Sequence, residues 1–280
     1  MYILKWYTPI GEGGYSMYRW EAHGDAKAVI VIVHGTMENP GRYQWLIEMW
    51  RSEGYHVITG DLPGQGVSTR SNRGHINSFE EYLDQVTGWI YTLYDYQLPI
   101  FIWGHSIGGL ISVRLLQEEE LNVAGLILSS PCLGLVSYPH KALHAASAVL
   151  NLAYPSFKKD TGITIDMLTR DEELRASVVH EAKVSVRWYR EMIAAMKEAF
   201  ENIPELSDVP ILVMQAGDDK VVDKQAVREW FNYIFTSEKA YMEWKGLYHE
   251  LFSEPEKENV FYYAKGFVEN RLRNLGYVVY

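Results

Sequence analysis

From residue 28 onward, short apolar runs alternate with longer runs in which apolar positions recur at a helical spacing. Uninterrupted apolar runs are typical of strands covered on both faces, and amphipathic runs are typical of the helices that cover them. Strands are predicted over 28–33, 55–60, 100–103, 123–129, 211–215 and 240–244. Helices are predicted over 43–53, 78–96, 110–119, 224–235 and 255–275. This order predicts an α/β fold with a mostly parallel sheet and helices on both faces.

Two segments depart from this alternation. The β-rich runs 2–8 and 15–22, separated by a glycine-rich turn, predict an antiparallel hairpin at the sheet edge. Between 132 and 208 the helical runs 140–152 and 184–200 flank a polar middle that lacks a strand of the apolar kind. We therefore expect a core formed by 1–131 and 209–280, with 132–208 inserted as a helical cap.

Composition narrows the function classes. A chain of 280 residues that is 48% hydrophobic suits one α/β domain with an insertion. The net charge of -10, with no concentration of Lys and Arg, argues against a nucleic-acid partner. The chain shows no signal-peptide pattern, its apolar runs are too short to span a bilayer, and Cys132 is its single cysteine. We expect a cytoplasmic protein with no metal site and no nucleotide cofactor, since no ligand cluster or phosphate-binding glycine motif occurs.

One short motif carries the chemistry. The apolar run 100–103 leads into Gly104-His105-Ser106-Ile107-Gly108, and a helical run follows from Leu110. A G-x-S-x-G between a strand and a helix is typical of a nucleophile elbow, in which the serine hydroxyl stands at the carboxyl end of the sheet. Glycine is needed on both sides because neighbouring backbone leaves no room for a Cβ atom. The alternative is an ordinary strand-to-helix turn, but the flanking elements favour Ser106 as a nucleophile.

A serine nucleophile needs a base and a carboxylate that orients the base. Of nine histidines, His249 is the one in the loop after the last predicted strand, so we assign it as the base. Asp218 and Asp219 follow the strand 211–215, and from that loop either carboxylate could reach the His249 imidazole. The residues that follow favour Asp219, with Asp218 as a turn residue and Asp223 as the N-cap of the next helix.

The acyl-transfer intermediate also needs two backbone N–H donors for its oxyanion. Ile107, directly after the serine, is expected to supply one. Thr36, which follows His34-Gly35 after the strand 28–33, is expected to supply the other. The alternative for this segment is a simple glycine turn with a locally bonded His34.

Together with Asp61-Leu62-Pro63-Gly64-Gln65-Gly66-Val67-Ser68, these motifs resemble the α/β-hydrolase superfamily over nearly the whole chain. The run His34-Gly35-Thr36-Met37-Glu38-Asn39-Pro40-Gly41-Arg42-Tyr43 is similar to HGxGEHxGRY of its monoacylglycerol lipase and bacterial lysophospholipase branch. Met37 stands where that branch has glycine, and Asn39 where it has histidine. The resemblance implies the triad Ser106, Asp219 and His249, the oxyanion donors Thr36 and Ile107, and substrate contacts by Glu38 and Arg42.

The resemblance implies a cofactor-independent serine hydrolase that cleaves a single fatty acyl ester, a monoacylglycerol or a lysophospholipid, through an acyl-enzyme. Apolar faces in the cap support an acyl site to which Leu150, Trp188 and Met192 contribute. These faces also suit simple packing, or transient contact with a membrane surface. The alternatives are a short-acyl carboxylesterase and a non-catalytic binding protein. In each case the partner is a small acyl ester or monoacyl lipid.

Overall fold

The computed structural model describes residues 17–66, 72–138, 140–177 and 182–277. Within these residues one sheet has the strand order β1-β3-β2-β4-β5-β8-β9. Its strands, in chain order, are Met17–Trp20, Ala28–Val33, Tyr55–Gly60, Ile100–His105, Gly125–Ser129, Ile211–Ala216 and Lys239–Trp244. Strand β1 is antiparallel to β3, and all other neighbours are parallel. The predicted α/β fold with a mostly parallel sheet is confirmed.

Alternate residues of the central strands enter two apolar clusters, one on each face of the sheet. In β2, for example, Val29 and Val31 belong to one cluster, and Ile30 and Ile32 to the other. The strands read as continuous apolar runs because both of their faces are buried. The antiparallel strand expected at the sheet edge is present as β1, which pairs with β3. The predicted partner run 2–8 lies outside the described residues.

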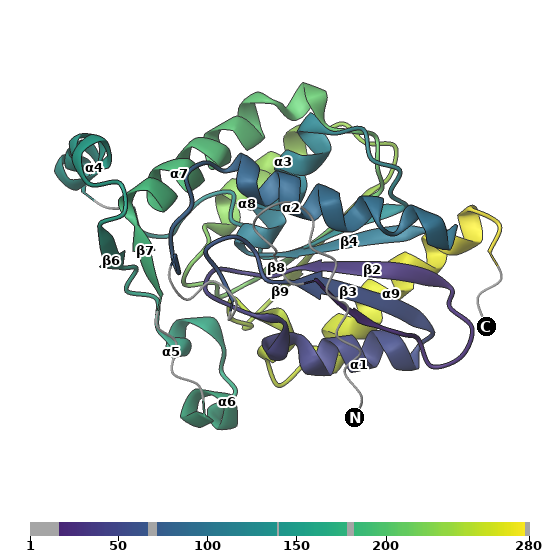
Figure 1. Cartoon of the computed structure of the whole chain (residues 1–280). Helices are drawn as coiled ribbons and strands as arrows, with labels where there is room; N and C mark the ends of the chain where they lie inside the picture. Colours follow the sequence, from purple (N-terminus) through teal and green to yellow (C-terminus); the bar gives the residue numbers. More distant parts are fainter. Residues whose placement is uncertain (1–16, 67–71, 139, 178–181, 278–280) are drawn as a thin grey trace.

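Helices cover both faces of the sheet (Figure 1). One layer consists of α1 (Gln44–Ser52) and α9 (Lys257–Asn274), whose apolar residues join the second cluster. The opposite layer consists of α2, α3 and α8, which span Glu80–Tyr91, Ile107–Glu118 and Lys224–Tyr233. Short 3₁₀ turns, η1 to η4, span Pro40–Tyr43, Tyr94–Tyr96, Ile203–Glu205 and Leu251–Ser253.

The segment between β5 and β8 contains the expected cap helices. Its elements are α4 (Lys141–Ala153), β6 (Lys158–Asp160), α5 (Ile165–Leu168), α6 (Glu172–Ser177), β7 (Lys183–Ser185) and α7 (Val186–Glu201). Helix α7 packs on α3, while α4 packs on α7 and extends away from the sheet (Figure 1). The antiparallel pair β6 and β7 was not expected, because β6 is short, polar and exposed and so has no apolar pattern. We keep 132–208 as the proposed extent of the cap.

Candidate active site

Ser106 occupies a strained turn between β4 and α3. Its backbone has φ 54° and ψ -120°, a conformation that side-chain-bearing residues rarely adopt. A Cβ atom on Gly104 would lie 2.6 Å from the Gly108 carbonyl oxygen, and one on Gly108 would lie 2.0 Å from the Val33 carbonyl oxygen. The two glycines therefore allow β2, β4 and α3 to approach closely enough to form the turn.

Ser106, His249 and Asp219 form one hydrogen-bonded chain. His249 Nε2 lies 2.9 Å from Ser106 Oγ, and His249 Nδ1 lies 2.9 Å from Asp219 Oδ2. Asp219 follows β8 and His249 follows β9, so the three side chains come from the carboxyl ends of three parallel strands. With Nδ1–H donated to the carboxylate, Nε2 is free to accept the serine proton.

The structure separates the two neighbouring aspartates. The Asp219 carboxylate is fully buried and also accepts hydrogen bonds from the N–H groups of Val221 and Val222, both at 2.9 Å. Asp218 is exposed and bonds through its backbone N–H to Leu247. Asp223 caps α8 by accepting a bond from the Gln225 N–H, as its position predicted.

Burial and charge shift the pKa values of the pair in opposite directions. Burial alone raises the pKa of Asp219, but the His249 ring and the two N–H donors outweigh it and hold this pKa below the ordinary value. Burial alone lowers the pKa of His249, but the Asp219 carboxylate outweighs it and raises this pKa above the ordinary 6.5. The pair therefore stabilises the protonated form of the His249 ring.

The loop after β2 lies against the elbow and carries Thr36. His34 is buried; it accepts a bond from the Leu62 N–H at Nε2, and its Nδ1 lies 2.8 Å from the Gly35 carbonyl oxygen. Within the described residues, neither the Thr36 N–H nor the Ile107 N–H has a hydrogen-bond acceptor. Both amides are thus available to a bound oxyanion.

Glu38 and Arg42, expected to touch substrate, lie in a buried polar network beside His249. Glu38 accepts bonds from the Gly35 N–H at 2.7 Å and the Tyr43 hydroxyl at 2.6 Å. The Arg42 Nη2 atom lies 2.8 Å from both carboxylate oxygens of Glu250, the residue that follows His249. The network therefore connects the loop after β2 to the histidine loop.

This network leaves little space for a substrate group. The adjacent cavity has a volume of about 30 Å³, room for one or two water molecules, and is lined in part by Glu38 and Arg42. Burial raises the pKa of Glu38, but His105, Arg42 and the Tyr43 hydrogen bond outweigh it and bring this pKa to about 2. Substrate contact by Glu38 and Arg42 stays a prediction, while their contacts within the protein are direct.

The predicted cap residues have different surroundings. Trp188 and Met192 on α7 are 3% and 6% exposed and belong to the apolar cluster that contains Ile107, next to Ser106. Leu150 on α4 is half-buried. The buried face of α7 fits the packing alternative, because it covers α3 directly.

The insertion also contacts the histidine loop. The Glu250 N–H donates to the Leu168 carbonyl oxygen at 2.8 Å, and the Thr169 hydroxyl donates to the Ser253 carbonyl oxygen at 2.6 Å. Glu254, fully buried, pairs with Arg170. The loop that carries His249 is thus held between the core and the insertion.

Three polar residues that the sequence analysis did not single out take part in the site region. Glu250 pairs with Arg42 across 208 positions of the chain, and Tyr43 bonds Glu38. Gln65 accepts a bond from the Met37 N–H. Gln65, Tyr43 and Glu250 lie within or directly beside the motifs of the sequence analysis, but no local signal distinguishes their side chains.

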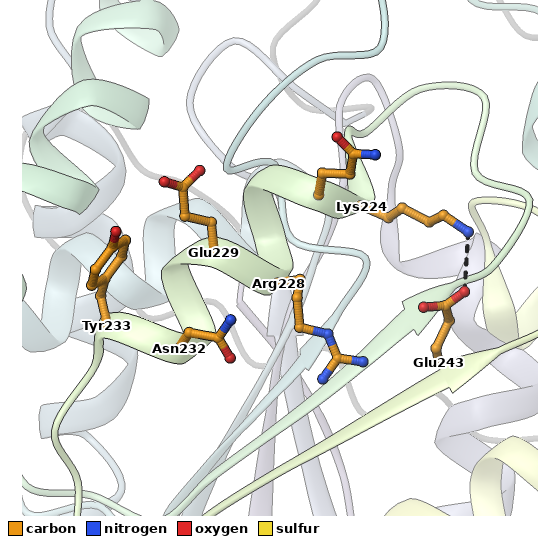
Figure 2. Close-up of a pocket in the computed structure, with 7 residues that line it drawn as sticks. Lys224, Arg228, Glu229, Asn232, Tyr233 and Glu243 are labelled. Carbon is orange, nitrogen blue, oxygen red and sulfur yellow. Dashed lines mark hydrogen bonds and ion pairs between the residues drawn. The ribbon is translucent and has the colours of Figure 1, made fainter.

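A larger hollow lies elsewhere, between α8 and β9 (Figure 2). It has a volume of about 440 Å³, and Lys224 on its rim pairs with Glu243. It contains none of the predicted site residues, so the hydrogen-bonded triad and not cavity size locates the site.

The described residues hold no cluster of metal-ligating side chains, and no helix among them has the length and hydropathy to cross a membrane. Cys132 is buried, which raises its thiol pKa to about 12.

Comparisons with known proteins identify the family of the chain. Residues 24–256 match the family described as Serine aminopeptidase, S33. Phospholipase YtpA of Bacillus subtilis (strain 168) is 51% identical over 258 residues, which cover 90% of this chain and 99% of that protein. Monoglyceride lipase of Homo sapiens is 28% identical over 278 residues, which cover 95% of this chain and 90% of that protein.

A solved structure shares the fold. The soluble variant of monoglyceride lipase from Saccharomyces cerevisiae, in complex with a substrate analog, superposes with a TM-score of 0.86 at 20% identity and covers 96% of each chain. The chain therefore belongs to the α/β-hydrolase family described as serine aminopeptidase S33, in the branch that contains phospholipases and monoglyceride lipases.

Proposed function

We propose that this serine hydrolase cleaves the ester bond of a monoacyl lipid, a monoacylglycerol or a lysophospholipid, with Ser106 as nucleophile. The hydrogen-bonded chain from Ser106 through His249 to Asp219 carries the proposal. The phospholipase and monoglyceride lipase names of its relatives support the substrate class.

Acylation uses the triad and two amides. His249 Nε2 takes the Ser106 proton as Oγ attacks the ester carbonyl carbon. The resulting oxyanion accepts hydrogen bonds from the Thr36 and Ile107 N–H groups. Asp219 stabilises the imidazolium and keeps the ring in the orientation that the attack needs.

Acylation ends when the tetrahedral intermediate collapses: the bond to the alcohol oxygen breaks, and His249 donates its proton to that leaving group. Deacylation then repeats these steps with water. Water, deprotonated by His249, then attacks the acyl-Ser106 ester. The bond between Ser106 Oγ and the acyl carbon breaks, His249 returns its proton to Oγ, and the free fatty acid leaves. The protein needs no redox step for this reaction, because the two half-reactions only transfer an acyl group and protons.

Helix α4 is the proposed site of contact with the lipid surface that holds the substrate. It exposes large apolar side chains: Leu143, Val149 and Leu152 are 51%, 70% and 85% exposed, and Tyr154 and Phe157, just after the helix, are exposed as well. Burying such side chains in the interfacial region of a lipid aggregate is favourable. Leu150, half-buried on the same helix, is the proposed contact to the acyl chain.

A short-acyl carboxylesterase is the second candidate. The close packing of Trp188 and Met192 in the apolar cluster near Ile107 favours it, since a long acyl chain would have to move these side chains. A panel of 4-nitrophenyl esters from acetate to palmitate, with monoacylglycerol and lysophosphatidylcholine, separates the two candidates. Rates that rise with acyl length support the lipid substrate, and a maximum at acetate supports the second candidate.

The nucleophile is tested by covalent labelling. A fluorophosphonate should add one label, at Ser106, and abolish ester hydrolysis. Ser106→Ala should remove both the labelling and the activity while keeping the wild-type circular dichroism spectrum. Full activity in the folded Ser106→Ala protein would contradict the proposal.

A further inference from the structure

A chain of buried hydrogen bonds leads from the cap helix α7 to the loop that carries Thr36. The Trp188 Nε1–H donates to the Tyr82 hydroxyl oxygen at 2.8 Å, and Gln65 Nε2 donates to the same oxygen at 3.1 Å. The Met37 N–H donates to Gln65 Oε1 at 2.5 Å. Gln65 and Tyr82 are fully buried, and Trp188 is nearly so. The chain thus connects four segments that lie far apart in sequence.

Met37 has a backbone conformation that methionine does not favour. Its φ is 60°, in the left-handed region, and the Glu38 N–H bonds to the Gly35 carbonyl oxygen across the turn at 3.4 Å. A turn with positive φ at its third residue ordinarily has glycine there, because a Cβ atom is strained in this region. A compensating contact is needed, and the bond from Met37 to Gln65 provides one.

Of the three consecutive backbone N–H groups of residues 35–37, two donate hydrogen bonds to side-chain oxygens. Glu38 accepts from the Gly35 N–H, and Gln65 accepts from the Met37 N–H. The Thr36 N–H between them has no acceptor within the described residues. An oxyanion donor works best when its direction is set before the reaction, since then no reorganisation is needed in the transition state.

We propose that Gln65 is a positioning residue for the oxyanion amide of Thr36. By accepting the Met37 N–H it holds Met37 left-handed, and with it the turn that presents Thr36. Tyr82 orients the Gln65 amide, and Trp188 extends this support into α7. Glutamine suits the position because one side chain both accepts and donates. The inference rests on the proposed function, in which Thr36 stabilises the oxyanion.

The test compares Gln65→Met in two backgrounds. In the wild-type background, it should lower kcat for 4-nitrophenyl acetate at least about tenfold with little change in KM, less than the loss of a whole oxyanion donor. In the Met37→Gly background the same substitution should cost clearly less kcat, because glycine adopts positive φ without strain. Gln65→Glu, which keeps an acceptor oxygen, should retain more kcat than Gln65→Met.

Gln117→Met is the matched control. Gln117 is also buried, accepts from Arg114 and donates to the Ala199 carbonyl oxygen on α7, but it lies far along α3 from the turn. It should lower the melting temperature without lowering kcat. Tyr82→Phe, which removes one hydroxyl, should lower kcat less than Gln65→Met does, and serves if the Gln65 variants do not fold.

Several results would overturn the inference. These are an unchanged kcat in Gln65→Met or Tyr82→Phe, an equal kcat loss in the wild-type and Met37→Gly backgrounds, and an equal loss in Gln117→Met. A loss expressed in KM alone would also overturn it. An active Ser106→Ala protein would instead refute the proposed function, so the two failures are distinguishable.

Discussion

Replacing Arg42 by methionine distinguishes a role in holding two loops together from a role in binding substrate. The Arg42 guanidinium contacts both oxygens of Glu250 and lies 3.7 Å from Glu38. The Arg42 side chain is 13% exposed, and each carboxylate side chain is 6% exposed. Burial lowers the pKa of His105 to about 4, so this neighbour is uncharged at neutral pH. Arg42→Met therefore leaves two buried carboxylates without their cation.

The size of the effect follows from this burial. Removing one partner of a buried ion pair costs about 3–5 kcal/mol of unfolding free energy. For a chain of this size each kcal/mol lowers the melting temperature by about 2–3 °C, so Arg42→Met should lower it by roughly 6–15 °C. The double variant Arg42→Met with Glu250→Gln should recover part of the loss, because one uncompensated charge is removed.

The pH dependence gives a second measurement. Wild-type Glu38 has a folded-state pKa of about 2, below its ordinary 4.5, so its stabilising contribution is present above pH 4.5 and is lost as pH falls toward 2. Without Arg42, the folded-state pKa of Glu38 should rise above its unfolded value. The pKa of Glu250, which burial and Glu38 already raise in the wild type, should rise further. The stability difference from wild type should then be largest at pH 8 and smaller at pH 5.

Thermal unfolding by circular dichroism at both pH values, with kcat and KM for a short ester, checks these expectations. A normal melting temperature with a raised KM would show that Arg42 acts on substrate and would refute the reasoning. An equal stability loss at pH 8 and pH 5 would refute its electrostatic part. The matched control is Arg51→Met, which removes an arginine with a more exposed partner, Glu48, and should cost much less.

Three further predictions concern catalysis and chain length. Asp219→Asn should lower kcat by about four orders of magnitude, as for other triad carboxylates, whereas the exposed Asp218→Asn should cost little; the reverse ranking would refute the assignment. Because the pKa of His249 is raised and the ring must be neutral to act as base, kcat/KM should fall as pH drops through a midpoint above 6.5. Each added acyl methylene is expected to contribute about 0.8 kcal/mol of binding free energy, and Leu150→Glu should reduce this contribution. The exposed Leu152→Glu should preserve it with monomeric esters. Equal effects of the two substitutions would exclude an acyl contact at Leu150.

Local sequence patterns determined the sheet, its covering helices and the position of Ser106. The strand over 28–33 was predicted to the residue, because a strand buried on both faces is apolar throughout. The strand over 55–60 was also predicted to the residue, although it contains His56 and Thr59. The elbow was recognisable because its glycines respond to contacts formed within a few residues and with the adjacent strand. The order serine, acid, histidine along the chain was expected from the nucleophile-elbow pattern, and the parallel sheet explains why the three loops meet at one edge.

The tertiary structure alone decided which polar groups meet. Asp218 and Asp219 have the same chemistry, and only the fold of their loop buries one against His249 and exposes the other. Arg42 pairs with Glu250, and Gln65 bonds the Met37 backbone. No repeating pattern of residues along the chain indicates either contact. Apolar periodicity reports burial, which many residues share, whereas a hydrogen bond depends on the position of two particular groups. Those positions are set by the packing of segments that the sequence separates, and so they appear only in the folded chain.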